Sequence, residues 1–169
     1  MKIDIIFWAM CINGEGSSLV TKNLITSILK LKNKNIKIVI TNSSTLYRLL
    51  SSNGTIKNNR NKIIIFPKFF RNYLFQILIK TLFPINYLCK SLITMDDFPF
   101  YFHKNQILYF QQAGIVKGHN LRWKLRRAFF KILIRKNHTI FTQTFHMKKS
   151  LHDKFKLSEK QIITQLHEV

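Results

Sequence analysis

Residues 1–34 constrain the fold most, because in a single pass they show the pattern of a strand, a glycine turn and a helix. The apolar run from Ile3 to Met10 is rich in β-branched and aromatic side chains, which is typical of a strand buried on both faces. A glycine turn ends the run, and Ser17 or Ser18 is expected to cap the helix that follows. One face of that helix is apolar: Val20, Leu24, Ile28 and Leu31. This order predicts the opening of a βαβ unit.

The glycines of the turn, Gly14 and Gly16, also have a functional interpretation. In a βαβ unit a glycine loop lets a ligand approach the backbone, and the helix N-terminus offers unpaired N–H groups to an anion. The Gly14-x-Gly16 spacing is a fragment of a dinucleotide fingerprint, without its third glycine or its acidic ribose ligand. A ligand-binding loop and a plain tight turn both stay open at this point.

The rest of the chain continues the alternation of strand and helix. Six further apolar runs have strand length: 36–40, 63–66, 88–95, 107–110, 138–143 and 162–166. Residues 51–61 are polar and predict a loop, whereas 68–83 predict a helix that is apolar around its whole axis and needs a partner or lipid. We therefore expect one α/β domain over residues 1–169, with a Rossmann-like, mostly parallel sheet of about six or seven strands and helices on both faces.

Charge is the most unusual feature of the composition. The chain has 28 Lys and Arg residues against 7 Asp and Glu residues, which gives a formal net charge of +21. Such a protein attracts polyanions, either nucleic acid or an anionic membrane surface. No recognisable RNA- or DNA-binding motif is present. The two cysteines and the histidines, which we expect mostly on the surface or in loops, have no metal-binding spacing, so no metal is expected.

The stretch 121–136 is the second informative helix, because seven of its sixteen residues are basic. Helical spacing places one apolar stripe toward the core: Leu121, Leu125, Ala128, Phe129 and Ile132. On the far side a second apolar ridge is expected to be exposed beside two arginines, and the set forms a predicted membrane-binding surface: Trp123, Arg126, Arg127, Phe130 and Ile134. The alternative is that another domain or subunit covers the ridge.

Three segments, in this order, resemble a known family. They are Asn13-Gly14-Glu15-Gly16-Ser17 after the opening strand, the Asp96-Asp97 loop, and the closing stretch from Thr139 to Lys149. Together they are similar to the N-terminal half of the "group 1", or family 4-like, GT-B glycosyltransferases. The resemblance implies a Rossmann-like domain that binds the acceptor and faces a second domain that binds the nucleotide sugar. It implies no cofactor other than this donor substrate.

The resemblance also suggests substrate-binding residues. Gly14 and Gly16 match the glycine loop that approaches the donor phosphates and the acceptor. Asp96 and Asp97 lie where the C-terminal edge of the sheet can contact acceptor hydroxyls, although a capped turn explains them equally well. Two glutamines replace a histidine that many members carry, and they can bind a sugar hydroxyl without titrating: Gln111 and Gln112. Thr144 matches the residue that caps the helix after the sixth strand. No catalytic residue can be assigned.

The expected function is therefore that of a glycosyltransferase half. The Glu-x7-Glu element of the family's donor site is absent, so the chain is expected to be truncated or split and inactive alone, with a separate C-terminal half as a possible partner. We expect it on the cytoplasmic face of a bacterial plasma membrane, in lipopolysaccharide or capsule assembly on a lipid-linked or glycan acceptor. The alternatives are a basic nucleic-acid-binding protein and a non-catalytic remnant or scaffold of such an enzyme.

Overall fold

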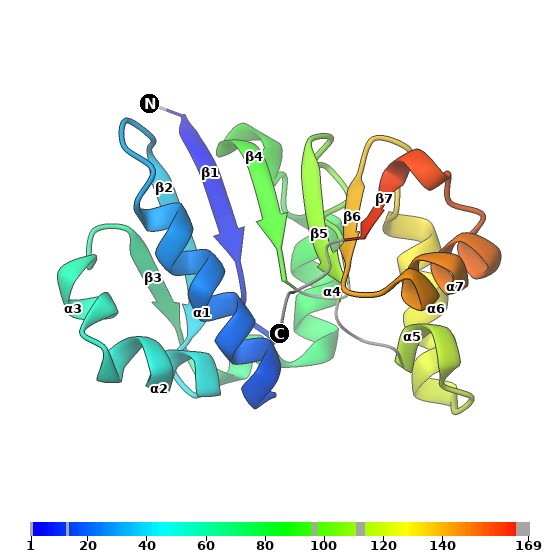
Figure 1. Cartoon of the computed structure of the whole chain (residues 1–169), viewed down its shortest axis with the longest axis horizontal. Coiled ribbons are helices and arrows are strands. Elements are labelled where there is room, and N and C mark those ends of the chain that lie inside the picture. Colours follow the sequence, from blue (N-terminus) through cyan, green and yellow to red (C-terminus); the bar gives the residue numbers. More distant parts are fainter. Residues whose placement is uncertain (1, 13, 96–97, 111–113, 165–169) are drawn as a thin grey trace.

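A computed structural model describes residues 2–12, 14–95, 98–110 and 114–164. Within these residues the chain forms one seven-stranded sheet in the order β3-β2-β1-β4-β5-β6-β7, in which every neighbouring pair is parallel (Figure 1). The predicted α/β class, a Rossmann-like parallel sheet with helices on both faces, is confirmed.

Each strand coincides with one of the apolar runs of the sequence. The strands are β1 (Ile3–Trp8), β2 (Ile36–Thr41), β3 (Ile63–Phe66), β4 (Cys89–Thr94), β5 (Gln106–Phe110), β6 (Thr139–Thr142) and β7 (Ile162–Thr164). In the centre of the sheet Phe7 pairs with Ile38 on β2 and with Ile93 on β4. Parallel strands need long crossovers, and the helices between the strands provide them.

Helices cover the sheet from both sides, with α1 in front of the strands and α4 behind them in Figure 1. The helices are α1 (Glu15–Leu29), α2 (Thr45–Ser52), α3 (Thr55–Asn58), α4 (Tyr73–Leu82), α5 (Gly114–Lys117), α6 (Leu121–Leu133) and α7 (Phe145–Phe155). The described residues also contain three single-turn 3-10 helices: η1 (Lys68–Arg71), η2 (Ile85–Tyr87) and η3 (Glu159–Gln161).

The pleat of the strands divides the core into layers. Phe7 belongs to the cluster formed with α1 and α2, which includes Ile25 and Leu46. Its neighbours on β1, Ile6 and Trp8, belong to the opposite cluster. A third cluster joins β5, β6, α6 and α7: Phe110, Phe130, Leu133, Ile140, Leu151 and Phe155 are among its members. Every β1 side chain from Ile6 onward is buried, as expected of a central parallel strand.

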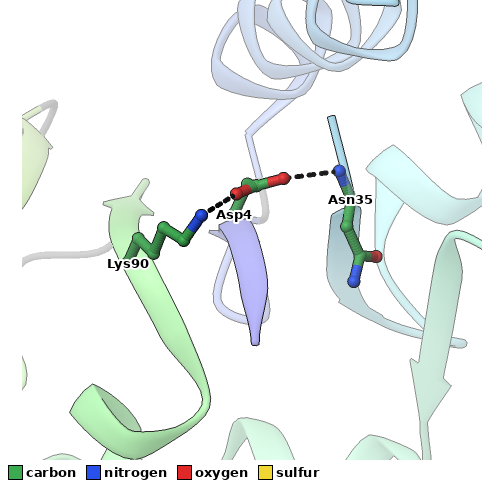
Figure 2. Close-up of polar contacts among 3 residues, drawn as sticks. All are labelled: Asp4, Asn35 and Lys90. Carbon is green, nitrogen blue, oxygen red and sulfur yellow. Dashed lines mark hydrogen bonds and ion pairs between the residues drawn. The ribbon is translucent and has the colours of Figure 1, made fainter. Parts of the chain in front are cut away.

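A polar contact fixes the amino-terminal edge of the sheet (Figure 2). Asp4 on β1 accepts a hydrogen bond from the backbone N–H of Asn35 at 2.9 Å and forms an ion pair with Lys90 on β4 at 2.8 Å. The hydrogen bond from Lys90 is the main reason why the pKa of Asp4 lies below its ordinary value. The contact therefore connects β1 to both of its neighbours, at the edge opposite the glycine turn.

Two predicted boundaries are wrong. Residues 51–61 are not a plain loop, because α2 continues to Ser52 and the short helix α3 follows. The predicted helix over 68–83 is broken at Asn72, whose ψ of 131° is not helical. There the side chain of Asn72 accepts a hydrogen bond from the N–H of Leu74 at 3.0 Å, so Asn72 caps α4 and separates it from η1.

Candidate functional site

The strand order creates a switch point between β1 and β4. From β1 the chain passes through α1 to β2 on one side, whereas β4 is followed by β5 on the other side. In open parallel sheets ligands bind outside the carboxyl ends of the strands where the order reverses in this way. The loop that contains Gly14 starts at this point of the edge, so the glycine turn is the first candidate for a binding site.

No side chain caps the N-terminus of α1. Its N-cap residue is Gly14, and no side-chain cap hydrogen bond is present. The predicted caps are therefore wrong: Ser17 and Ser18 lie inside the first turn, where the Ser17 hydroxyl donates to the Gly14 carbonyl at 3.0 Å. The first backbone N–H groups of an uncapped helix stay available to a ligand. The predicted apolar face is confirmed in part: Val20, Leu24 and Ile28 pack against the core, whereas Leu31 is exposed. The fully buried residues of α1 are Ser18, Thr21 and Ile25.

The two glycines of the turn differ in what surrounds them. Gly14 has φ −79° and ψ 150°, a conformation open to any residue, but a Cβ there would lie 3.1 Å from the Ser17 hydroxyl. A Cβ on Gly16 would meet nothing within 4 Å. At Gly14 the Ser17 side chain therefore occupies the space beside the backbone, whereas Gly16 borders open space in which a ligand can approach the backbone.

Several other predicted site residues cannot be placed with the glycines. Asp96, Asp97, Gln111 and Gln112 lie outside the described residues. Thr144 is described, and it caps α7 as expected: its hydroxyl accepts a hydrogen bond from the N–H of Met147 at 3.1 Å. A substrate-binding role for these residues stays a prediction.

Two buried polar residues of α4, which were not among the predicted site residues, lie beneath this edge. Gln76 accepts a hydrogen bond from the Trp8 indole at 3.3 Å, and its amide nitrogen lies 3.7 Å from the sulfur of Met10, just beyond the end of β1. Lys80 is 1% exposed and donates to the Phe98 carbonyl at 2.9 Å. The signal in the sequence was their spacing, since two polar residues four positions apart in an apolar helix lie on one face.

Lys80 also helps to position the segment between β4 and β5. The N–H of Tyr101 donates to the Lys80 carbonyl at 2.8 Å, and the Phe100 ring packs against the Trp8 ring with centroids 4.9 Å apart. Gln106 accepts from the N–H of Phe100 at 2.8 Å. These contacts hold residues 98–101 between α4 and the sheet. This described part of the β4–β5 connection therefore has a fixed position.

The structure reverses the apolar faces expected for α6. Phe130 is fully buried, with its ring centroid 5.8 Å from Phe110 and 4.7 Å from Phe155. Trp123 and Ile134 are partly buried against the same cluster. Leu121, Leu125 and Ile132, which were expected in the core, are instead exposed. The interpretation of Trp123, Phe130 and Ile134 as an exposed membrane-binding ridge is therefore wrong. Phe110 of β5 and Phe155 of α7 pack against Phe130, so this side of α6 faces the core.

The two arginines assigned to the ridge make internal contacts. Arg126 is buried, and its guanidinium carbon lies 4.6 Å from the centre of the Trp123 ring. Arg127 donates to the carbonyls of Ile115 at 3.3 Å and Gly118 at 2.6 Å, which are free acceptors at the end of α5. These contacts explain why both arginines face the inner side of α6. Because Arg126 is buried, it cannot contact lipid headgroups.

A buried polar cluster occupies the amino-terminal edge of β4, β5 and β6. The thiol of Cys89 lies 3.5 Å from the ring of His103, and the Nε2 atom of His138 lies 2.9 Å from the His103 carbonyl. The histidines were expected on the surface or in loops; these two lie in loops, but they are buried. Burial lowers the pKa of His138 to about 4 and raises that of Cys89 to about 11. The cluster is therefore uncharged at neutral pH and far from the carboxyl edge.

The described residues contain no group of three or more His, Cys, Asp or Glu side chains that could hold a metal ion. Comparison of the chain with protein-family models, curated proteins and solved structures finds no match.

Proposed function

We propose that this chain is the acceptor-binding half of a GT-B-type glycosyltransferase that acts in bacterial cell-surface polysaccharide assembly. The observation that carries the proposal is the glycine turn and uncapped α1 N-terminus at the switch point beside β4. The resemblance of the residue motifs supplies the substrate class, a lipid-linked or glycan acceptor. A second Rossmann-like domain, on another segment or chain, would bind the nucleotide sugar.

The chemistry of this edge suits a sugar better than a bare phosphate. Free N–H groups at the start of α1 donate hydrogen bonds, and the exposed carboxylate of Glu15 beside them accepts hydrogen bonds. Sugar hydroxyls both donate and accept, whereas a phosphate meets repulsion from Glu15. This combination supports the acceptor rather than the donor as the ligand of this half.

We also propose that the protein works as a peripheral protein on the cytoplasmic face of the plasma membrane. The formal charge of +21 supports an anionic lipid surface as a partner. Among the described residues no helix has the length and apolar character needed to cross a bilayer.

Acceptor binding is tested by NMR on the 15N-labelled chain. Short-chain polyprenyl diphosphate sugars, short oligosaccharides and nucleotide sugars are titrated separately, with a DNA oligonucleotide for comparison. We expect lipid-linked sugars to shift the amide signals of residues 14–18, and Gly16→Val to abolish the shift without changing the fold. The proposal is wrong if no glycan shifts these signals, or if only the oligonucleotide does.

Transferase activity provides a second test. Because one Rossmann-like domain cannot enclose both substrates of a GT-B enzyme, the purified chain should transfer no sugar from any nucleotide donor. Transfer by the chain alone, measured with a radiolabelled donor, would contradict its assignment as a half enzyme.

A further inference from the structure

We infer that the outer surface of α4 rests on an anionic lipid bilayer, with acyl chains against Leu74, Leu78 and Leu82. This inference rests on the membrane placement proposed above and names the surface responsible for it. Of the two segments for which the sequence suggested contact with lipid, it keeps the apolar stretch 68–83 and drops the α6 ridge.

α4 is apolar on its outer side as well as on its inner side, where Ile77 is buried and Ile79 packs against the core. Leu74, Leu78 and Leu82 lie at a spacing of four and are 73%, 53% and 66% exposed. Gln76 and Lys80, on the opposite side, are buried at 2% and 1%. A surface helix in water normally turns its apolar stripe toward the core. The exposed stripe therefore indicates an apolar environment outside the protein.

The inner contacts of α4 prevent the helix from rotating to bury its leucines. Gln76 is bonded to the Trp8 indole, and Lys80 is bonded to the Phe98 carbonyl. Rotation of α4 would break both hydrogen bonds, and neither polar group would gain a better partner in the core. The orientation of the leucines is thus set by the fold.

The leucine stripe is part of a larger apolar surface. Leu74 and Leu78 line an open groove of about 500 Å³ together with Phe69, Asn72 and Phe75. The Phe69 ring contacts the rings of Phe70 and Phe75, at centroid distances of 4.2 and 5.9 Å. Further exposed apolar residues follow at the other end of α4: Phe83, Tyr87 and Leu88. Exposed apolar surface of this extent marks an interaction site in a protein of this size.

Charge favours a bilayer over a protein partner as the occupant. Lys68 and Arg71 lie in η1, directly before the leucine stripe, and Lys68 is exposed. The sequence from Ser17 to Met95 contains no acidic residue at all. Apolar side chains with cations beside them fit the boundary between acyl chains and anionic headgroups. At ten residues α4 is too short to span a membrane, so it would lie in the interface.

The position of α4 connects the bilayer to the proposed site. Gln76 reaches Met10 just beyond the carboxyl end of β1, where the glycine turn begins. A lipid-linked acceptor could then keep its chain in the bilayer beside α4 while its sugar reaches the switch point. Contact with lipid would present the acceptor from the α4 side of the sheet.

Vesicle binding with matched variants tests the inference. The wild-type chain is compared with Leu74→Ser/Leu78→Ser, which removes two members of the stripe. The matched control is Leu19→Ser/Leu31→Ser, because these leucines are similarly exposed but belong to α1 and the turn after it, on the opposite face of the sheet. A second comparison is Leu125→Ser/Ile132→Ser on the exposed side of α6. Each protein is sedimented with neutral or anionic vesicles at low and high salt.

We expect the α4 variant to lose about tenfold or more of its partition into anionic vesicles, while both other variants bind like the wild type. High salt should weaken wild-type binding without abolishing it, since salt does not screen apolar insertion. The inference is overturned if wild type binds no vesicle, if the α4 variant binds normally, or if only the α6 variant loses binding. A lipid-independent dimer that the α4 substitutions dissociate, measured by light scattering, would also overturn it. Glycan binding at Gly16 is measured without vesicles, so it can succeed or fail independently.

Discussion

At the scale of single residues, His138 is the clearest pH-sensitive position. Its Nε2 atom faces the His103 carbonyl, and its Nδ1 atom accepts a hydrogen bond from the N–H of Arg135 at 3.3 Å. Protonation would place a second N–H against the Arg135 N–H. Burial is the main reason why the pKa of His138 falls from 6.5 to about 4; the hydrogen bond to the His103 carbonyl acts in the opposite direction, and the positive charge of Arg135 adds to the lowering.

We predict that His138 makes the protein less stable in mild acid. Below pH 6.5 the unfolded chain binds a proton on this ring that the native protein does not bind, so the free energy of unfolding falls as pH decreases toward about 4. The loss from this residue reaches up to about 3 kcal/mol and then levels off. His138→Gln keeps a donor for the His103 carbonyl but cannot titrate. Urea unfolding across pH 4–7 should show a shallower pH dependence in the variant, and equal slopes would contradict the prediction.

Gly16 gives a second prediction at this scale. Its Cβ position is open and it lies in the first turn of α1, where glycine is less favourable than alanine. We expect Gly16→Ala to raise the free energy of unfolding by about 0.5 kcal/mol. Gly14→Ala should instead be neutral or destabilising, because the new Cβ would crowd the Ser17 hydroxyl. Chemical unfolding of the two variants measures the difference, and a destabilised Gly16→Ala would mean that this turn is tighter than the structure shows.

At the scale of elements, strands were predictable from the sequence, but helix faces were predictable only in part. Buried parallel strands are continuous apolar runs, so 36–40 and 63–66 match β2 and β3 within one residue. α6 has apolar residues on two opposite sides, and helical spacing alone does not show which side meets the core. The rings of Phe110 and Phe155, which are distant in the sequence, pack against Phe130 and thereby determine which side of α6 is buried. The candidate site was predictable only at Gly14 and Gly16, because the role of Gln76 depends on Trp8 and Met10.

The corrected orientation of α6 leads to a stability prediction. Phe130→Ala should lower the free energy of unfolding by about 3–5 kcal/mol, because it leaves a cavity between Phe110 and Phe155. Leu125→Ala, on the exposed side, should change it by less than about 0.5 kcal/mol. Thermal and urea unfolding of both variants provide the comparison. Similar losses in the two variants would show that the assignment of the faces is wrong.

At the scale of the whole molecule, the charge should make the fold sensitive to salt. A compact chain of 169 residues has a radius of gyration of about 15 Å. At 0.01 M ionic strength the Debye length is about 30 Å, so the excess positive charges repel one another across the molecule. At 0.3 M the repulsion reaches only near neighbours. The unfolded chain is larger and spreads the same charge, so screening favours the folded state.

We therefore predict that the melting temperature rises as sodium chloride increases from about 0.01 to 0.3 M, by several degrees in all. A protein stabilised mainly by surface ion pairs would show the opposite trend, because salt weakens attraction as well as repulsion. The control replaces the salt with an uncharged osmolyte such as sucrose at equal osmolality, which does not screen charge. Substituting four exposed lysines with glutamine (Lys32, Lys57, Lys104 and Lys149) should lessen the rise, because repulsion grows with the square of the net charge. A melting temperature that falls with salt would show that local attractive pairs outweigh the +21 charge in stabilising this fold.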